Sequence, residues 1–286
     1  MKSGQHDTGS QPLRAPLLEN KDYESPSVFS PHKLLDNARR QRQLAEEPVP
    51  SVCVLDPDGD IVRHLTRRGM AQRVHSWACY HTELHRFLLD GAPIGVIPCA
   101  VGGAFAVLVA EQLFTSGCEI LVSITSAGRI LPVRRPPYFV LIEKALRDEG
   151  TSYHYLPPST YVEIDPALSA FTGDVVRRAS TPIERGAAWT TDAPFRETEA
   201  AVAFAEAEGI LAVEMEAASL YAFAQARQKP VLCFALVTNQ PSETGNDFEK
   251  GEGDGSIASL ELLRVAAYCW RERGNPGGGN FEGRSR

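Results

Sequence analysis

Val-Glu-Met-Glu-Ala-Ala, residues 213–218, places Glu214 and Glu216 on either side of Met215, and an apolar, helix-forming run follows it through Ala224. Carboxylates are almost never fully buried unless a partner satisfies them. A ribose, whose two vicinal hydroxyls both donate hydrogen bonds, is one such partner. The segment therefore has two interpretations: a pair of acids that binds a sugar, or an amphipathic helix whose two acids face solvent.

Outward from this segment, short apolar stretches alternate with helix-forming stretches. The short ones predict strands at Ser51–Leu55, Ile94–Cys99, Ile120–Ile124, Ala212–Met215 and Val231–Val237. The others predict helices at Phe105–Phe114, Pro137–Glu149, Glu197–Ala207, Ala217–Gln228 and Ile257–Trp270. Because the strands are apolar on both faces, we expect an α/β fold with a central mixed, partly parallel β-sheet flanked by helices.

The chain is predicted to form a single domain between two tails. Residues 1–29 and 272–286 are rich in small, polar and charged residues, and we expect both to be disordered. Ser30 and Pro31 are typical of a helix start, and a short helix through Lys33–Ala38 is expected after them. Because there is no internal repeat and no break in composition, residues 30–271 are predicted to form one domain.

Composition argues against several classes of protein. A formal net charge of −7 disfavours a nucleic-acid-binding surface. No apolar run reaches membrane-spanning length, and the polar residues 1–29 lack the pattern of a signal peptide. The six cysteines form no Cys-x-x-Cys pair, which favours buried free thiols in a reducing cytoplasm over a disulfide framework or a zinc site. We therefore expect a cytoplasmic protein without nucleic acid or membrane partners.

Four further segments accompany the Glu-Met-Glu-Ala-Ala segment. Asp56–Arg63 is similar to a Gly-Asp-Pro…Arg loop, Val101–Ala106 to a Gly-Met-Gly-x-Pro turn, Ser123–Ile130 to an Arg-x-Gly-Thr/Ser-x-Gly loop, and Val237–Asn239 to the end of a late strand. In this order, the segments resemble the nucleoside phosphorylase and nucleosidase superfamily. The resemblance implies a nucleoside phosphorylase-like fold, a homo-oligomer (dimer, trimer or hexamer), a nucleoside and phosphate as small-molecule substrates, and no cofactor or metal.

The resemblance also assigns the ribose site. Enzymes of this family break an N-glycosidic bond through a ribosyl cation, which anionic groups near the sugar stabilise. By resemblance, Glu216 is catalytic and accepts hydrogen bonds from the ribose hydroxyls, and Met215 packs against the sugar. Glu214 is expected to bind ribose too, or else to support Glu216 or face solvent.

The base site is expected on the loop after residue 190 and at the late strand end. Phe195 is the candidate for stacking on the base, or else an ordinary core phenylalanine. Arg196 is expected to donate to a base carbonyl; alternatively, Asp192 caps the next helix and Arg196 and Glu197 lie on its first turn. Purine-specific relatives carry an aspartate where this chain has Asn239, and an amide cannot supply an acid proton. Uridine phosphorylases also carry Asn there, so Asn239 is expected to be catalytic and to favour a pyrimidine.

The phosphate site departs from the family pattern. Phosphorylases carry an arginine where this chain has Ser123, and serine is no substitute for a bidentate guanidinium. The resemblance leaves a phosphate site built from Arg63, Ser126 and the backbone amide of Gly102, near Arg129. Arg63 is otherwise a solvated surface arginine.

Reversible phosphorolysis of a nucleoside, as in uridine phosphorylases, is therefore expected to yield free base and ribose 1-phosphate in nucleotide salvage. Because Ser123 replaces the arginine, two alternatives stay open. One is a hydrolytic nucleosidase, since nucleosidases of the family also lack that arginine. The other is a catalytically weakened protein that only binds a nucleoside.

Two histidine patterns have weaker interpretations. His81 and His85 have the spacing of a helical metal site, but the segment reads as a strand, so no metal site is expected. His32 resembles a histidine that some relatives lend to the ribose pocket of a neighbouring subunit; a surface histidine at a helix start is the alternative.

Overall fold

The computed structural model describes residues 15–238 and 252–274. The strands in this part of the chain are β1 (Val52–Asp56), β2 (Gln72–Arg73), β3 (His85–Leu89), β4 (Ala92–Pro98), β5 (Ile120–Ser126), β6 (Gly128–Arg129), β7 (Tyr138–Asp148), β8 (Tyr161–Glu163), β9 (Ile183–Thr191), β10 (Ile210–Glu214) and β11 (Val231–Val237). The α-helices are α1 (Pro31–Arg42), α2 (Asp60–Arg67), α3 (Gly103–Thr115), α4 (Ser169–Arg178), α5 (Glu199–Ala207), α6 (Ala217–Arg227) and α7 (Ser256–Gly274). Short 3₁₀ helices are η1 (Pro16–Leu18), η2 (Ser152–His154), η3 (Pro166–Leu168), η4 (Pro194–Arg196) and η5 (Glu252–Gly255).

The described strands form one mixed sheet in the order β2-β3-β4-β1-β5-β11-β7-β9-β10-β6, and β8 pairs with β7. Strands β4, β1, β5 and β11 are mutually parallel, whereas β7 runs antiparallel to β11. Only Ala127 separates β5 from β6, yet β6 pairs with β10 at the far end of this order. The sheet therefore curls back on itself, and the end of β10 is brought next to the end of β5.

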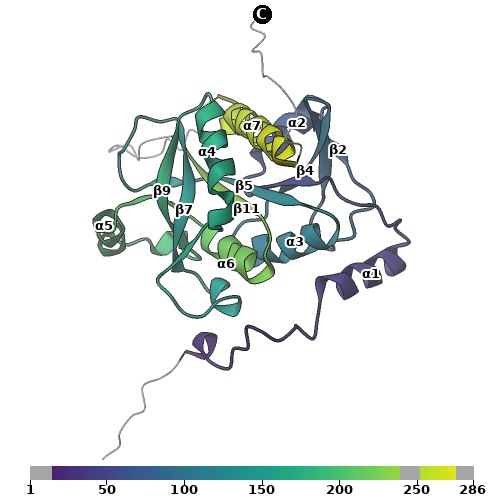
Figure 1. Cartoon of the computed structure of the whole chain (residues 1–286), viewed down its shortest axis with the longest axis horizontal. Coiled ribbons are helices and arrows are strands. Elements are labelled where there is room, and N and C mark those ends of the chain that lie inside the picture. The colour runs from purple at the N-terminus through teal and green to yellow at the C-terminus, as the bar shows by residue number, and fades with distance from the viewer. Residues whose placement is uncertain (1–14, 239–251, 275–286) are drawn as a thin grey trace, which may run out of the picture.

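Helices cover both faces of the sheet (Figure 1). On one face, α3 and α6 pack their apolar residues against the strands, for example Leu113 and Phe223 against Leu55 and Cys233. On the other face lie α2, α4 and α7. Helix α5 covers the outer side of β9 and β10 through a smaller cluster that includes Trp189. The expected α/β architecture is confirmed.

The five predicted strands and four of the five longer predicted helices are present, and the short helix capped by Ser30 extends to Arg42. The helix predicted at Pro137–Glu149 is wrong. This segment is β7, the longest strand, which pairs with β11, β9 and β8. Its first half, Tyr138–Ile142, is fully buried among other strands, and this packing outweighs the helix-forming charged residues of the second half.

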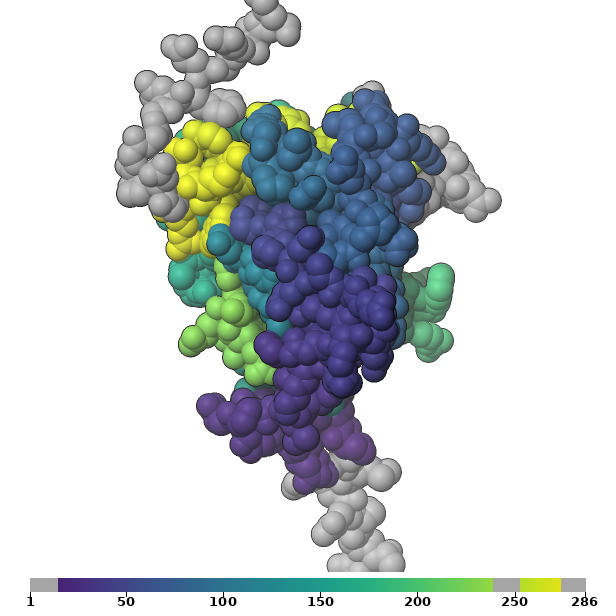
Figure 2. Space-filling model, turned by 90° about the vertical axis from the view of Figure 1, so that its right-hand side faces the viewer, coloured from purple at the N-terminus to yellow at the C-terminus, as the bar shows by residue number. Residues whose placement is uncertain are grey.

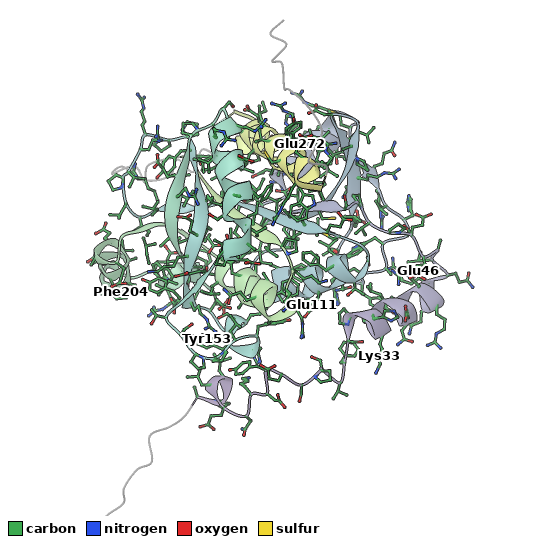
Figure 3. All side chains as sticks on the ribbon, viewed as in Figure 1. Lys33, Glu46, Glu111, Tyr153, Phe204 and Glu272 are labelled. Atoms are coloured by element: carbon green, nitrogen blue, oxygen red, sulfur yellow. The ribbon has the colours of Figure 1, made fainter. Side chains whose placement is uncertain are left out.

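The segment before β1 lies along the surface, where Figure 2 shows it as a purple strip. Helix α1 packs through Leu35 and Ala38 against Ala78. Further upstream, the hydroxyl of Tyr23 donates to the backbone oxygen of Tyr153 (3.3 Å), which attaches this segment to η2 (Figure 3). Part of the predicted tail, residues 15–29, therefore contacts the domain.

The sequence predicts no membrane-spanning segment and cysteines that are buried free thiols. In residues 15–238 and 252–274, no helix is long and apolar enough to cross a membrane. The six cysteines are all free; five are buried, and Cys99 is exposed.

Candidate active site

Three parallel strands end side by side and supply the loops of the candidate site. Strands β4 and β5 run in register with β1, which lies between them, so that Pro98 lies beside Asp56 and Ser126 ends the next strand. The curl of the sheet adds Glu214, the last residue of β10. Ligands in α/β sheets gather at the carboxyl ends of strands, which are the ends that meet here.

Glu216 is held by the start of α3. The backbone N–H of Gly102 donates to its Oε1 at 2.7 Å, and its Oε2 has no hydrogen-bond partner among the described residues. Gly102 has a φ of +84°, a conformation that side chains of L-residues disfavour. Only 1% of Glu216 is exposed, so within the described part of the chain this oxygen is a buried polar atom without a hydrogen-bond partner.

Glu214 lies behind Glu216 and caps α6. Its Oε2 accepts the backbone N–H groups of Glu216 and Ala217, both at 2.8 Å. The hydroxyl of Thr190 donates to its Oε1, and Thr190 in turn accepts the N–H of Ala218 at 3.0 Å. Because Glu214 is 4% exposed and Glu216 is 1% exposed, the interpretation in which both acids face solvent is wrong.

Burial sets the electrostatics of this pair. Burial, together with the neighbouring charges of Glu214 and Asp58, raises the pKa of Glu216 to about 8 against the opposing hydrogen bond from Gly102. Burial also raises the pKa of Glu214, although Thr190 and the α6 amides stabilise its charged form. Glu216 is therefore largely protonated in the free protein at neutral pH. Hydroxyl donors or a cationic sugar would favour its ionised form.

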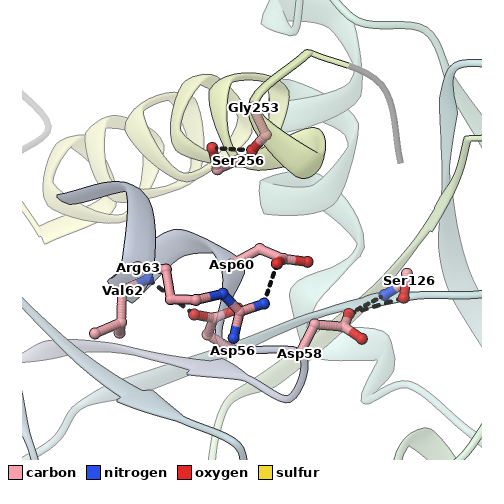
Figure 4. Close-up of polar contacts among 8 residues, drawn as sticks. All are labelled: Asp56, Asp58, Asp60, Val62, Arg63, Ser126, Gly253 and Ser256. Atoms are coloured by element: carbon pink, nitrogen blue, oxygen red, sulfur yellow. Dashed lines mark hydrogen bonds and ion pairs between the residues drawn. The ribbon is translucent and has the colours of Figure 1, made fainter. Parts of the chain in front are cut away.

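The carboxylate of Asp58 accepts both hydrogen-bond donors of Ser126, the backbone N–H and the hydroxyl. Its Oδ2 accepts the backbone N–H of Ser126 at 2.8 Å and the Ser126 hydroxyl at 2.9 Å (Figure 4). Ser126 and Gly102 are predicted to bind phosphate, yet a carboxylate accepts both Ser126 donors, and the amide of Gly102 serves Glu216. The anion at the Ser126 position thus comes from the protein itself.

The segment from Asp56 to Arg63, which runs from the end of β1 into α2, is acidic around its single arginine. Arg63 pairs with Asp60, and its side chain remains 48% exposed (Figure 4). Asp56 accepts the N–H of Val62 at 3.0 Å, and burial raises its pKa to about 6. Ser123 is 1% exposed inside the sheet, and its hydroxyl has no partner among the described residues. Its position in β5 therefore adds no cationic group to the candidate site.

The predicted base residues lie on the loop after β9. Phe195 in η4 is fully exposed, so the alternative of a core phenylalanine is wrong. Arg196 is also exposed. Helix α5 is capped by Thr198 and not by Asp192, whose carboxylate accepts the N–H of Gly150 at 2.9 Å. That alternative for Arg196 is therefore wrong as well.

Two predictions remain, one for Asn239 and one for the histidine pair His81 and His85. Asn239 lies outside the described residues, which stop one residue after the end of β11. His85 is the first residue of β3, and His81 lies in the bend before it; no group of three or more side chains that could hold a metal ion occurs in residues 15–238 and 252–274.

Four residues of the site were assigned no role from the sequence: Asp58, Glu149, Thr190 and Ser219. Asp58 lies in the Asp-Pro-Asp-Gly-Asp segment, and the density of acids in this segment is the sequence signal that points to a carboxylate in the site. Thr190 and Ser219 contact the two glutamate side chains Glu214 and Glu149. These contacts follow from the pairing of β9 with β10 and of β7 with its neighbours, and no local sequence pattern signals them.

The chain is similar in sequence to known proteins. A sequence profile described as the phosphorylase superfamily matches residues 52–267. Uncharacterized protein R802 of Acanthamoeba polyphaga mimivirus is 26% identical over 144 residues, 50% of this chain and 56% of that protein. A uridine phosphorylase of Thermococcus kodakarensis is 28% identical over 109 residues, 34% of this chain and 39% of that protein. The chain thus spans about half of the length of the first of these curated relatives and less than half of the length of the second.

Solved structures share the fold. A uridine phosphorylase of Vibrio fischeri ES114 superposes with a TM-score of 0.65 at 18% identity, covering 79% of this chain and 95% of that chain. The structure of that protein complexed with 6-hydroxy-1-naphthoic acid gives a TM-score of 0.62 at 18% identity, with 80% and 96% covered. At this identity, the similarity shows a common architecture.

Proposed function

The chain belongs to the phosphorylase superfamily, and from this membership we propose that it cleaves the N-glycosidic bond of a nucleoside, with phosphate as the acceptor. The products are then a free base and ribose 1-phosphate. The uridine phosphorylases among its relatives and structural neighbours support this reaction type.

One observation carries the proposal: Glu216 is a buried carboxyl with one oxygen fixed by Gly102 and the other without a partner among the described residues. A ribose would supply the missing donors through its hydroxyls. As the glycosidic bond lengthens, the sugar becomes cationic, and a fixed carboxylate then interacts more strongly than it does with the neutral substrate. Glu216 therefore binds ribose and stabilises the transition state in this proposal.

Two residues support Glu216 in different ways. Glu214 holds the start of α6 through the amides of Glu216 and Ala217, which fixes the backbone that carries the ribose acid. Met215 is partly exposed between them and is proposed to pack against the sugar. Binding of the sugar draws the proton off Glu216, because the hydroxyl donors favour the ionised form.

For the base, we propose a pyrimidine, with Phe195 stacked on its ring and Arg196 donating to a carbonyl. Asn239 supports this choice in sequence terms, because an amide donates a hydrogen bond to a base but supplies no acid proton. The full exposure of Phe195 leaves its ring available to a ligand.

Hydrolysis is the second candidate, and Asp58 favours it. Phosphate could use the two donors of Ser126 only if the Asp58 carboxylate moved away, and two adjacent anions repel. Water has no charge to be repelled, and a carboxylate at this place would accept its proton during attack. In this reaction the products are free base and ribose.

One experiment separates the candidates. The protein is incubated with uridine, inosine and adenosine, with and without phosphate, and free base, ribose and ribose 1-phosphate are measured. Phosphorolysis requires base release that rises with phosphate to saturation, together with ribose 1-phosphate. Release at full rate without phosphate, together with ribose, selects hydrolysis. No release from any nucleoside, despite a raised Tm in its presence, would instead select a binding protein.

A further inference from the structure

Glu149 is a third buried carboxylate, next to the two glutamates of the candidate site. It follows the last residue of β7 and is 6% exposed. Its Oε2 accepts the backbone N–H groups of Thr151 at 2.7 Å and Ser152 at 3.0 Å. The hydroxyl of Ser219 donates to the same oxygen. Three donors thus converge on one carboxylate oxygen.

Ser219 connects this carboxylate to the ribose acid. It lies in the first turn of α6, directly after the segment that carries Glu216. The first turn of α3 packs against it with no side chain between them: a Cβ on Gly103 would overlap the Ser219 Oγ and would lie 3.4 Å from the Glu149 Oε2. Gly102, one residue earlier, holds Glu216. The start of α3, the start of α6 and Glu149 therefore meet at one point.

The residues on either side of Glu149 also contact the loop that is predicted to bind the base. The N–H of Gly150 donates to Oδ2 of Asp192 at 2.9 Å, and the N–H of Asp192 donates to the backbone oxygen of Asp148 at 3.4 Å. Asp192 begins the loop that carries Phe195 and Arg196. Residues 148–150 thus contact the first turn of α6, through Glu149, and the start of the loop that carries the predicted base residues.

We propose that Glu149 is a positioning residue for Glu216: by accepting the Ser219 hydroxyl, it holds the first turn of α6 against Gly102 and Gly103 and so fixes the orientation of the ribose acid. This inference rests on the proposed function, in which Glu216 binds the sugar. Glu149 itself touches neither sugar nor base; it acts through Ser219.

Glu149 lies among other charged side chains. The guanidinium of Arg147 attracts a negative charge at this position, whereas Glu214 repels it. The Nε of Arg147 donates to the Ser152 hydroxyl at 2.8 Å, and the backbone N–H of the same serine donates to Glu149. A glutamine would turn either its carbonyl or its NH₂ toward the three donors and would bind them more weakly.

The test compares Glu149→Gln, Ser219→Ala and the double variant, with Glu143→Gln as control. Glu143 lies on β7, the strand that Glu149 directly follows; it is partly exposed and pairs with Arg185 at the surface. Base release from uridine is measured with and without phosphate, and kcat and KM are determined separately alongside Tm. Each single variant is expected to lower kcat about tenfold with a smaller change in KM. The double variant is expected to lose no more than the worse single variant, because the two residues act as a unit.

Two outcomes would overturn the inference. One is kcat unchanged well below the Tm of each variant, which would leave Glu149 with a purely structural role. The other is a double variant whose loss equals the product of the single losses. An active wild type with unaffected variants overturns this inference alone. A wild type that neither releases base nor is stabilised by uridine overturns the proposed function and this inference with it.

Discussion

The backbone N–H of Gly102 donates to Oε1 of Glu216 at 2.7 Å, across 114 residues of sequence. This bond joins the start of α3 to the residue before α6 and fixes half of a buried carboxyl group. The other oxygen has no partner among the described residues. An acceptor that is already oriented needs no reorganisation when positive charge develops beside it. The bond is therefore the geometric basis for the predictions about Glu216.

Glu216→Gln is expected to lose most activity and to keep its fold. Glutamine retains the shape and one acceptor oxygen, but it cannot offer a negative charge to the ribosyl cation. We expect a loss of about 2–4 kcal/mol in transition-state stabilisation, measured as kcat/KM. Circular dichroism and Tm serve as controls for folding. Normal turnover by a folded variant would show that Glu216 is not the ribose ligand.

Activity is expected to rise with pH through the pKa of Glu216, which burial raises to about 8 in the free protein. The ionised form accepts the ribose hydroxyls and stabilises the cation, so kcat/KM should increase from about pH 6 and level off above that pKa. The profile of kcat should level off at lower pH, because the bound sugar favours the ionised form. A kcat/KM that is flat from about pH 6 to 9 would contradict the assignment.

The free energy of unfolding is expected to fall as pH rises, whereas activity is expected to rise. Burial raises the pKa of Glu216 from 4.5 to about 8, so between these values the folded protein holds a proton that the unfolded chain releases. Stability therefore falls as pH rises through this window. Asp56, whose pKa is raised to about 6, contributes in the same direction. Denaturant unfolding at several pH values should show a flatter dependence for Glu216→Gln than for the wild type.

The layered α/β fold was predictable from sequence because its core strands are short, apolar and rich in branched residues. Strand β7 was not, because its second half reads Glu-Lys-Ala-Leu-Arg-Asp, residues 143–148, which forms helices readily. Its pairing with three other strands is a long-range property that outweighs local preference. Strand β9 was also missed, since Glu184 and Arg185 interrupt its apolar pattern with side chains that are only partly buried or exposed.

Within the site, residues in sequence motifs were predictable, whereas their partners were not. Glu214 and Glu216 were identified from their own segment, and their burial agrees with a partnered role. Thr190 and Gly102 reach them only because the sheet curls and α3 begins at the right point. The occupation of Ser126 by Asp58 could not be read from the motif that contains either residue.

Arg63→Ala is expected to raise the apparent KM for phosphate more than that for nucleoside, if phosphate is the acceptor. The guanidinium is about half exposed on α2, where it pairs with Asp60 and is also accessible to an anion. Arg67→Ala is the matched control, because Arg67 lies on the same helix and is exposed. Equal effects of the two variants would assign Arg63 to general surface charge.

Asp58→Ala should reveal which nucleophile the site uses. The substitution frees the N–H and hydroxyl of Ser126 and removes a negative charge from their surroundings. If phosphate is the acceptor, it gains two donors and loses a repelling neighbour, so its apparent KM should fall while the KM for nucleoside stays constant. If water is the nucleophile, the variant loses the group that accepts its proton, and phosphate-free base release should drop by about 10²-fold or more. Base release with and without phosphate, with ribose and ribose 1-phosphate quantified, distinguishes the two results. Because the charge of Asp58 also raises the pKa of Glu216, the activity profile of the variant should shift to lower pH under either reaction. An unchanged rate, phosphate dependence and pH profile would show that Asp58 takes no part in the site.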